Sequence, residues 1–118
     1  MNRIPEYDKL HENPDTPTPS DFNWLAYIAY RNSIECGSEG INFDECIHKE
    51  QISGAVNILR KNNFETFTIS SGYSGLLDVF AEFERCGCEL VGMTVVKTPH
   101  KDWKTGEYEV KNAALFKI

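Results

Sequence analysis

The residues best placed for chemistry lie in the run TISSGYSGLL, at positions 68–77. Within it, residues 72–75 (Gly-Tyr-Ser-Gly) approximate the Gly-x-Ser-x-Gly turn that carries the nucleophile of many hydrolases. That turn needs a glycine on each side of the serine because it is tight, and here Leu76 stands at the fifth position. An α/β-hydrolase sheet also takes far more than 118 residues. We therefore predict that Ser74 is not a nucleophile and assign no catalytic residue.

The same run lies between a predicted strand and a predicted helix, where an anion could bind. The loop from Ser70 to Gly75 offers hydroxyl and amide donors to a phosphate. It lacks the lysine of a Gly-x-x-x-x-Gly-Lys loop. A structural interpretation explains the same residues, since Ser70 or Ser71 can cap the helix while Gly72 and Gly75 permit a tight turn. A phosphate- or nucleotide-binding enzyme is therefore the lesser alternative.

Four cysteines and a histidine could hold a metal ion. They are Cys36, Cys46, Cys86, Cys88 and His48. Their spacing matches no standard zinc knuckle, and two cysteines separated by one residue tend to point apart. We predict reduced thiols, no metal and no cofactor. The three histidines have no acidic partner that the sequence can identify, so none is assigned as a general base.

The composition predicts one soluble domain. Of the 118 residues, 41% are hydrophobic and 12% aromatic, enough for a modest core. There is no apolar run of about 18 residues and no basic leader followed by an apolar stretch, so we expect no membrane association and a cytoplasmic location.

The net charge of -6 lies entirely in the first half of the chain. Residues 1–50 carry ten carboxylates and four cations, whereas residues 51–118 carry eight of each. An acidic surface disfavours direct nucleic-acid binding, because affinity for a polyanion comes mostly from Lys and Arg. It suits a partner protein with a basic surface. A surface kept acidic for solubility is the open alternative.

Prolines and apolar spacing divide the chain into elements. Residues 1–20 hold four of the five prolines and predict an extended N-terminal arm. The spacing then predicts a helix over 21–35 that is capped by Ser20 and ends near Cys36-Gly37. It predicts a second helix over 43–61 with Asn42 as its cap. It further predicts a strand over 65–70, a helix from about 74 to a left-handed Gly87, and strands over 89–97 and 107–118.

These elements predict an α+β fold in the order α-α-β-α-β-β. Residues 21–118 should form a single α+β domain with a three-stranded mixed sheet packed against helices. The strand, helix and strand within residues 65–97 favour a crossover between parallel strands, followed by an antiparallel hairpin.

Two groups of aromatic residues could contact a partner. Trp24, Tyr27 and Tyr30 recur at helical spacing beside the apolar stripe of the first helix, so that helix is either deeply enclosed or has an aromatic contact face. Trp103 lies in the polar turn TPHKDWKTG, where a large indole has no structural role unless it folds back onto the sheet.

The C-terminal half resembles a group of small proteins from phages and integrative elements of Gram-positive bacteria. The similarity rests on FTISSGYSG, FERCGCELVGM, KDWKTGEYE and ALFKI, within residues 64–118. Small acidic proteins of such elements include anti-CRISPR inhibitors, and this chain is similar to them in size and charge. No functional residue follows from the resemblance.

The resemblance implies a non-enzymatic inhibitor that places an acidic surface in the basic nucleic-acid channel of a CRISPR effector nuclease. The expected contact residues surround the loop between the first two helices, with a tryptophan as anchor: Glu35, Glu39, Asp44, Glu45, Glu50 and Trp103. The alternative from another class is a homodimeric regulatory or structural module of a mobile element, paired through the first helix or the last strand.

Overall fold

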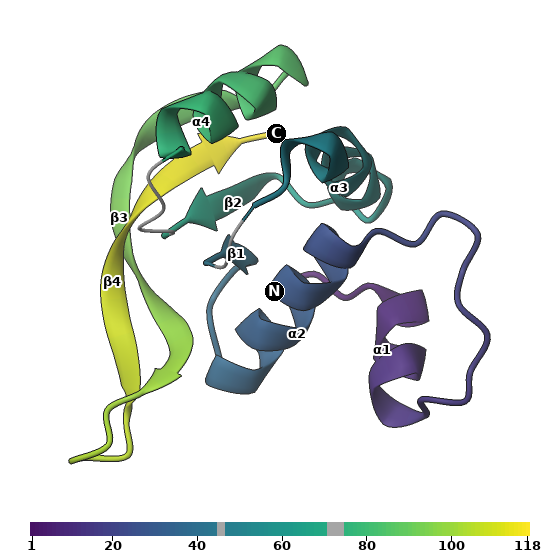
Figure 1. The fold of residues 1–118 in the computed structure, drawn as a ribbon, viewed down its shortest axis with the longest axis horizontal. Coiled ribbons are helices and arrows are strands. Elements are labelled where there is room, and N and C mark those ends of the chain that lie inside the picture. Colours follow the sequence, from purple (N-terminus) through teal and green to yellow (C-terminus); the bar gives the residue numbers. More distant parts are fainter. Residues whose placement is uncertain (45–46, 71–74) are drawn as a thin grey trace.

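A computed structural model describes residues 1–44, 47–70 and 75–118, and the fold is α+β (Figure 1). Its helices and strands, in chain order, are α1 (Pro5–Glu12), α2 (Trp24–Cys36), β1 (Asn42–Phe43), the 3-10 turn η1 (Lys49–Gln51), α3 (Ile52–Lys61), β2 (Thr66–Ile69), α4 (Leu76–Arg85), β3 (Glu89–Lys101) and β4 (Tyr108–Lys117).

The sheet has four strands in the order β1-β2-β4-β3, so the prediction of three strands and the order α-α-β-α-β-β was wrong. β1 runs parallel to β2, and β4 is antiparallel to both β2 and β3. β2 and β3 therefore run in the same direction, as the predicted crossover requires, but β4 lies between them. β4 pairs with β2 only over Ala114–Lys117, so it lies between two strands at its C-terminal end and pairs with β3 alone before that.

The second predicted helix is shorter than expected because its first residues form a strand. Phe43 is buried against Phe67 and Phe83, with ring centroids 5.5 Å from each. The backbone N–H of Asn42 donates to Ser33 Oγ at 3.0 Å, so Asn42 does not cap a helix. α3 begins only at Ile52, after η1. A strand of two residues is too short for its polar–apolar alternation to distinguish it from a helix start.

The N-terminal arm is not extended, because Pro5–Glu12 forms α1. Pro5 stands at the first turn, the one helical position that tolerates its missing N–H. Ile4 and Tyr7 are buried, and the ring of Tyr7 meets those of Phe22 and Tyr27 edge-on. Burial also raises the pKa of Tyr7 above its usual range. The arm therefore contributes to the core.

The boundaries of α2 follow from its caps. Its N-cap is Asn23, whose side chain accepts from the Ala26 N–H at 2.9 Å, and not the predicted Ser20. Its C-cap is Gly37, with a left-handed φ of 71°. The predicted end of this helix at Cys36-Gly37 is confirmed.

The core is centred on four phenylalanines: Phe43, Phe67, Phe83 and Phe116, from β1, β2, α4 and β4. All four are buried, and the centroid of the Phe67 ring lies 4.8 Å from that of Phe83. α2 lies against β1 and β3. In Figure 1, β2 lies between α4 above and α2 below, and the long β3–β4 hairpin extends past α2 at the lower left.

Candidate functional site

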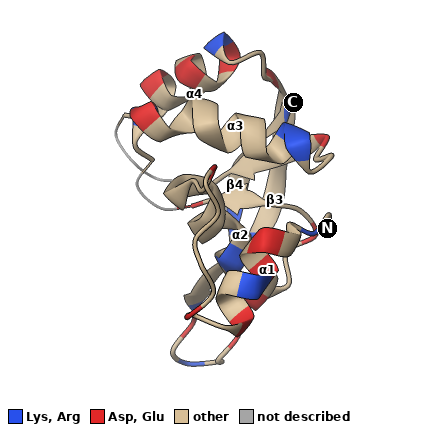
Figure 2. Cartoon of the chain, turned by 90° about the vertical axis from the view of Figure 1, so that its right-hand side faces the viewer, with Lys and Arg blue, Asp and Glu red and all other residues tan. Residues whose placement is uncertain are grey.

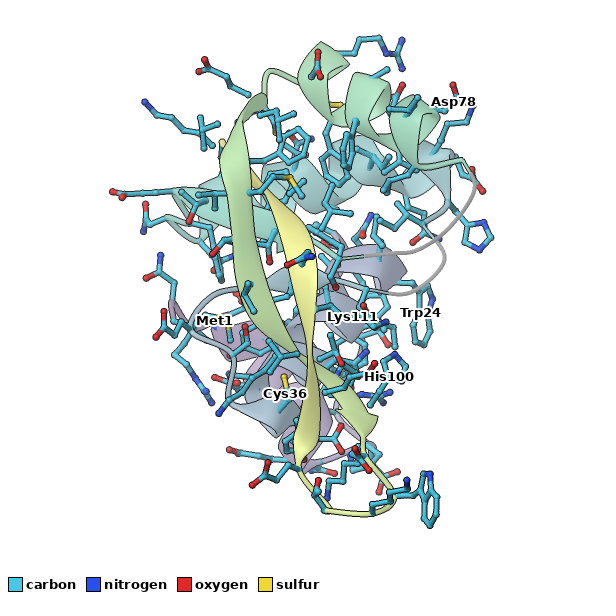
Figure 3. The ribbon with its side chains drawn as sticks, turned by 90° about the vertical axis from the view of Figure 1, so that its left-hand side faces the viewer. Met1, Trp24, Cys36, Asp78, His100 and Lys111 are labelled. Carbon is cyan, nitrogen blue, oxygen red and sulfur yellow. The ribbon has the colours of Figure 1, made fainter. Side chains whose placement is uncertain are left out.

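A partly buried polar cluster joins the sheet to the β3–β4 hairpin, and we call it the Asp44 cluster. Its members come from the end of β1, the end of β2 and both strands of the hairpin: Asn42, Asp44, Thr68, Ser70, His100 and Lys111. Figure 3 shows the labelled His100 and Lys111 close together beside the hairpin ribbon.

Asp44 is the centre of the cluster, and its side chain is only 3% exposed. Its Oδ1 accepts from Ser70 Oγ at 2.6 Å and lies 3.4 Å from Lys111 Nζ. Its Oδ2 lies 2.7 Å from His100 Nε2. Buried carboxylates are costly unless they are paired and hydrogen-bonded, and these partners supply both.

The network continues into β1 and β2. Asn42 Nδ2 donates to Ser70 Oγ at 2.8 Å, and Thr68 Oγ1 donates to Asn42 Oδ1 at 2.6 Å. The Ser70 hydroxyl therefore accepts one hydrogen bond and donates another, to Asp44. Among the described residues, no buried side-chain nitrogen or oxygen lacks a partner.

The Ser70 hydroxyl is not arranged as the nucleophile of a serine triad. A carboxylate bonded to a histidine can orient that histidine as a general base. In a serine triad, however, the serine hydroxyl bonds to the histidine, whereas Ser70 here donates to Asp44. The carboxylate thus links a serine of β2's end to a histidine and a lysine of the hairpin.

The predicted acidic residues do not form one surface. Glu35, Glu39 and Glu50 are exposed, but Asp44 is buried and paired, so its prediction as a contact residue was wrong. Glu45 lies outside the described residues. Glu35 and Glu39 flank Cys36, which contacts β3, whereas Glu50 belongs to η1.

Acidic residues also lie on α4, outside the predicted contact residues. Figure 2 marks acidic positions along α4 and positions of both charges on α1. Asp78 and Glu84 of α4 are exposed, and Glu82 pairs with Arg85. The outer side of α4 is therefore acidic, although the second half of the chain is neutral as a whole.

Trp103 lies at the tip of the β3–β4 hairpin and is 87% exposed. The turn is closed by backbone bonds from Asp102 N to Glu107 O and from Gly106 N to Asp102 O, each 2.8 Å, and Gly106 has a left-handed φ of 73°. Lys104 Nζ lies 5.3 Å from the centroid of the indole. The indole does not fold back onto the sheet.

The aromatic residues of α2 divide between core and surface. Tyr30 is buried and its hydroxyl donates to Asp8 Oδ1 at 2.7 Å, while Tyr27 is half-buried. Trp24 is 61% exposed, although its ring contacts that of Phe22 edge-on. The helix is therefore enclosed at Tyr30 and exposed at Trp24, and a contact face at this indole stays a prediction.

The described cysteines, Cys36, Cys86 and Cys88, are free thiols. Burial raises the pKa of the Cys36 and Cys88 thiols. Cys36 Sγ lies 3.6 Å from the Lys97 carbonyl oxygen, so this thiol joins α2 to β3. No three His, Cys, Asp or Glu side chains in the described part of the chain are grouped as a metal site requires, and Cys46 lies outside that part.

The predicted anion loop runs from Ser70 to Gly75. Residues 71–74, including Ser74, lie outside the described residues. Gly75 is the N-cap of α4 and Ser70 is bonded to Asp44, so Ser70 does not cap that helix.

In the described ranges no helix is both long enough and apolar enough to span a bilayer.

The fold and this site define a small α+β protein whose long hairpin is joined to its sheet by the Asp44 cluster. The chain belongs to the family described as "Domain of unknown function (DUF7698)", whose model matches residues 25–118. The matched region contains every strand and leaves α1 outside. No curated protein and no solved structure matches the chain.

Proposed function

We propose that this protein is a non-enzymatic inhibitor that binds the basic, nucleic-acid-binding surface of another protein, and that its β3–β4 hairpin makes the contact. The target that the sequence resemblance suggests is a CRISPR effector nuclease, whose nucleic acids lie in positively charged channels. The inhibitor competes with nucleic acid for that surface.

The observation that carries this proposal is the exposure of Trp103. An indole that is 87% exposed at the end of a hairpin loses the burial that stabilises most tryptophans. Tryptophan is also among the residue types that dominate binding energy at protein interfaces. A rigid aromatic anchor on a projecting hairpin suits insertion into a cleft of a partner.

Glu35 and Glu39 supply the charge complementarity. The hairpin tip is electrically balanced, since Lys101 and Lys104 offset Asp102 and Glu107. The two glutamates flank Cys36, whose thiol contacts the distal half of β3. Glu39 also lines a cleft with residues 94–97 of β3, so its carboxylate lies beside the hairpin, and Glu35 lies next to Cys36 in α2. A basic surface engaged by Trp103 would meet these charges. Such rim charges mainly accelerate association.

A DNA-cleavage assay with a panel of purified RNA-guided nucleases from Gram-positive bacteria tests the proposal. The protein should inhibit at least one nuclease, and E35K/E39K should weaken that inhibition mainly through a slower association rate. The matched control, E12K/E84K, changes the net charge equally at exposed sites on α1 and α4. Equal losses in both double variants, or no inhibition of any nuclease by the wild type, would contradict the proposal.

A further inference from the structure

The β3–β4 hairpin is irregular at the position of His100. Lys97 pairs with Val110 and Lys101 pairs with Tyr108, so β3 has two more residues than β4 between these pairs. Such bulges re-aim side chains and often lie beside functional sites. Pro99 suits this position because a bulge does not need its missing N–H.

The bulge turns two side chains toward the body of the protein. Thr98 is completely buried, and its hydroxyl donates to the Glu109 carbonyl oxygen at 3.0 Å. His100 reaches Asp44 Oδ2 at 2.7 Å. From the neighbouring strand, Lys111 Nζ approaches the other carboxylate oxygen at 3.4 Å. One carboxylate thus holds both strands of the hairpin.

Asp44 is itself fixed from the opposite side. Ser70 Oγ donates to it at 2.6 Å, and Asn42 Nδ2 holds Ser70 at 2.8 Å. These residues belong to the ends of β1 and β2, within the part of the sheet that contacts the aromatic core. The cluster therefore connects the hairpin to the strands that carry the aromatic core.

Beyond the cluster, the bonds of the hairpin tip are local. The Asp102, Lys104 and Gly106 N–H groups all bond within residues 102–107. A two-stranded hairpin is only marginally stable by itself in water. The direction of the tip therefore depends on where its two strands are attached to the sheet.

We infer that Asp44 is a positioning residue: through His100 and Lys111 it fixes the direction of the hairpin and so the place where Trp103 is presented. The relevance to inhibition rests on the proposed function, but the positioning itself does not. The ligand-free protein should hold the indole in one orientation, which lowers the entropy that binding must overcome.

Time-resolved fluorescence anisotropy of Trp103 in a W24F background tests the positioning without any partner. D44N retains an oxygen that can accept from Ser70 but loses the charge that faces Lys111. It should increase the amplitude of Trp103 motion, and H100A should do the same. The control E109Q changes an exposed side chain of the same hairpin and should have no effect.

Hydrogen exchange of residues 98–109 provides a second measurement. Protection there should fall about tenfold in D44N and H100A, the ratio that corresponds to about 1.4 kcal/mol of local opening. Protection in β2 should not change. Unaltered anisotropy and exchange in H100A, which has a half-exposed histidine and should fold, would overturn the inference even if D44N failed to fold.

Failure of the proposed function would look different. If Trp103 becomes mobile in H100A while no nuclease is inhibited by any form, the positioning stands and the inhibitor function falls. If a nuclease is inhibited by the wild type and equally by H100A, although Trp103 has become mobile, positioning does not matter for inhibition and that part of the inference is contradicted.

Discussion

The rings of Phe67 and Phe116 stack with their centroids 5.3 Å apart and their planes 6° from parallel. The two residues are directly opposite each other in β2 and β4, so one ring pair joins strands that are far apart in sequence. Phe83 of α4 contacts both rings. The packing of these three rings holds β4 beside β2 in the interior of the sheet.

Replacing Phe116 with Ala should therefore lower the free energy of unfolding by about 3–5 kcal/mol, because it removes a fully buried ring and leaves a cavity. Phe116→Leu retains most of the volume and should cost roughly 1.5 kcal/mol or less. Urea unfolding followed by circular dichroism measures both. Equal losses in the two variants would show that cavity formation is not the cause.

Asn23 and Gly54 give a sharper test of packing. A Cβ added at Gly54 would lie 2.6 Å from Asn23 Nδ2, which is held by a 3.0 Å bond to the Gln51 carbonyl oxygen. Gly54→Ala should therefore destabilise the protein, although alanine favours a helix interior by about 0.8–1 kcal/mol.

In an N23A background that clash is gone, and G54A should instead stabilise by roughly 0.5–1 kcal/mol. N23A alone should cost about 1 kcal/mol through the lost N-cap of α2. The double-mutant cycle separates these effects. If G54A has the same sign in both backgrounds, the close approach does not determine its effect.

The thiols should differ in their reactivity. Burial raises the pKa of Cys36 and Cys88, so at a given pH each has a smaller thiolate fraction than an exposed cysteine, and access is restricted as well. Cys86 is half-buried and should be alkylated first.

Iodoacetamide labelling of a C46S variant at neutral pH, followed by mass spectrometry, measures the order of modification. Alkylation of Cys36 should become faster as the pH rises above the range at which free cysteine becomes reactive. The same labelling in denaturant should remove the difference between sites. Native modification of Cys36 before Cys86 would contradict the burial of the α2–β3 contact.

The sequence predicted best the elements whose signals are local. The apolar stripe of α4 ends at Gly87, and that glycine has the left-handed φ of 91° that the pattern predicts. The strands of the hairpin and the C-cap of α2 at Gly37 were predicted for similar reasons. In each case the residues that specify the element lie within it.

The features that the sequence did not predict depend on residues far away along the chain. β1 has two residues and exists because it pairs with β2. Asp44 was predicted as an exposed contact residue, but its partners His100 and Lys111 are 56 and 67 positions away. The alternation of Asn42, Phe43 and Asp44 between polar and apolar residues is the one local signal of a strand there. Their pairing could not be read from one sequence.

The central claim is that Trp103 anchors a partner, and the most direct test compares W103A with the wild type against a nuclease that the wild type inhibits. W103A should unfold within about 0.5 kcal/mol of the wild type, because the indole is exposed. Its inhibition constant should rise by about 30-fold or more, as expected for an interface residue worth at least about 2 kcal/mol. An unchanged inhibition constant in a folded W103A protein would contradict the account.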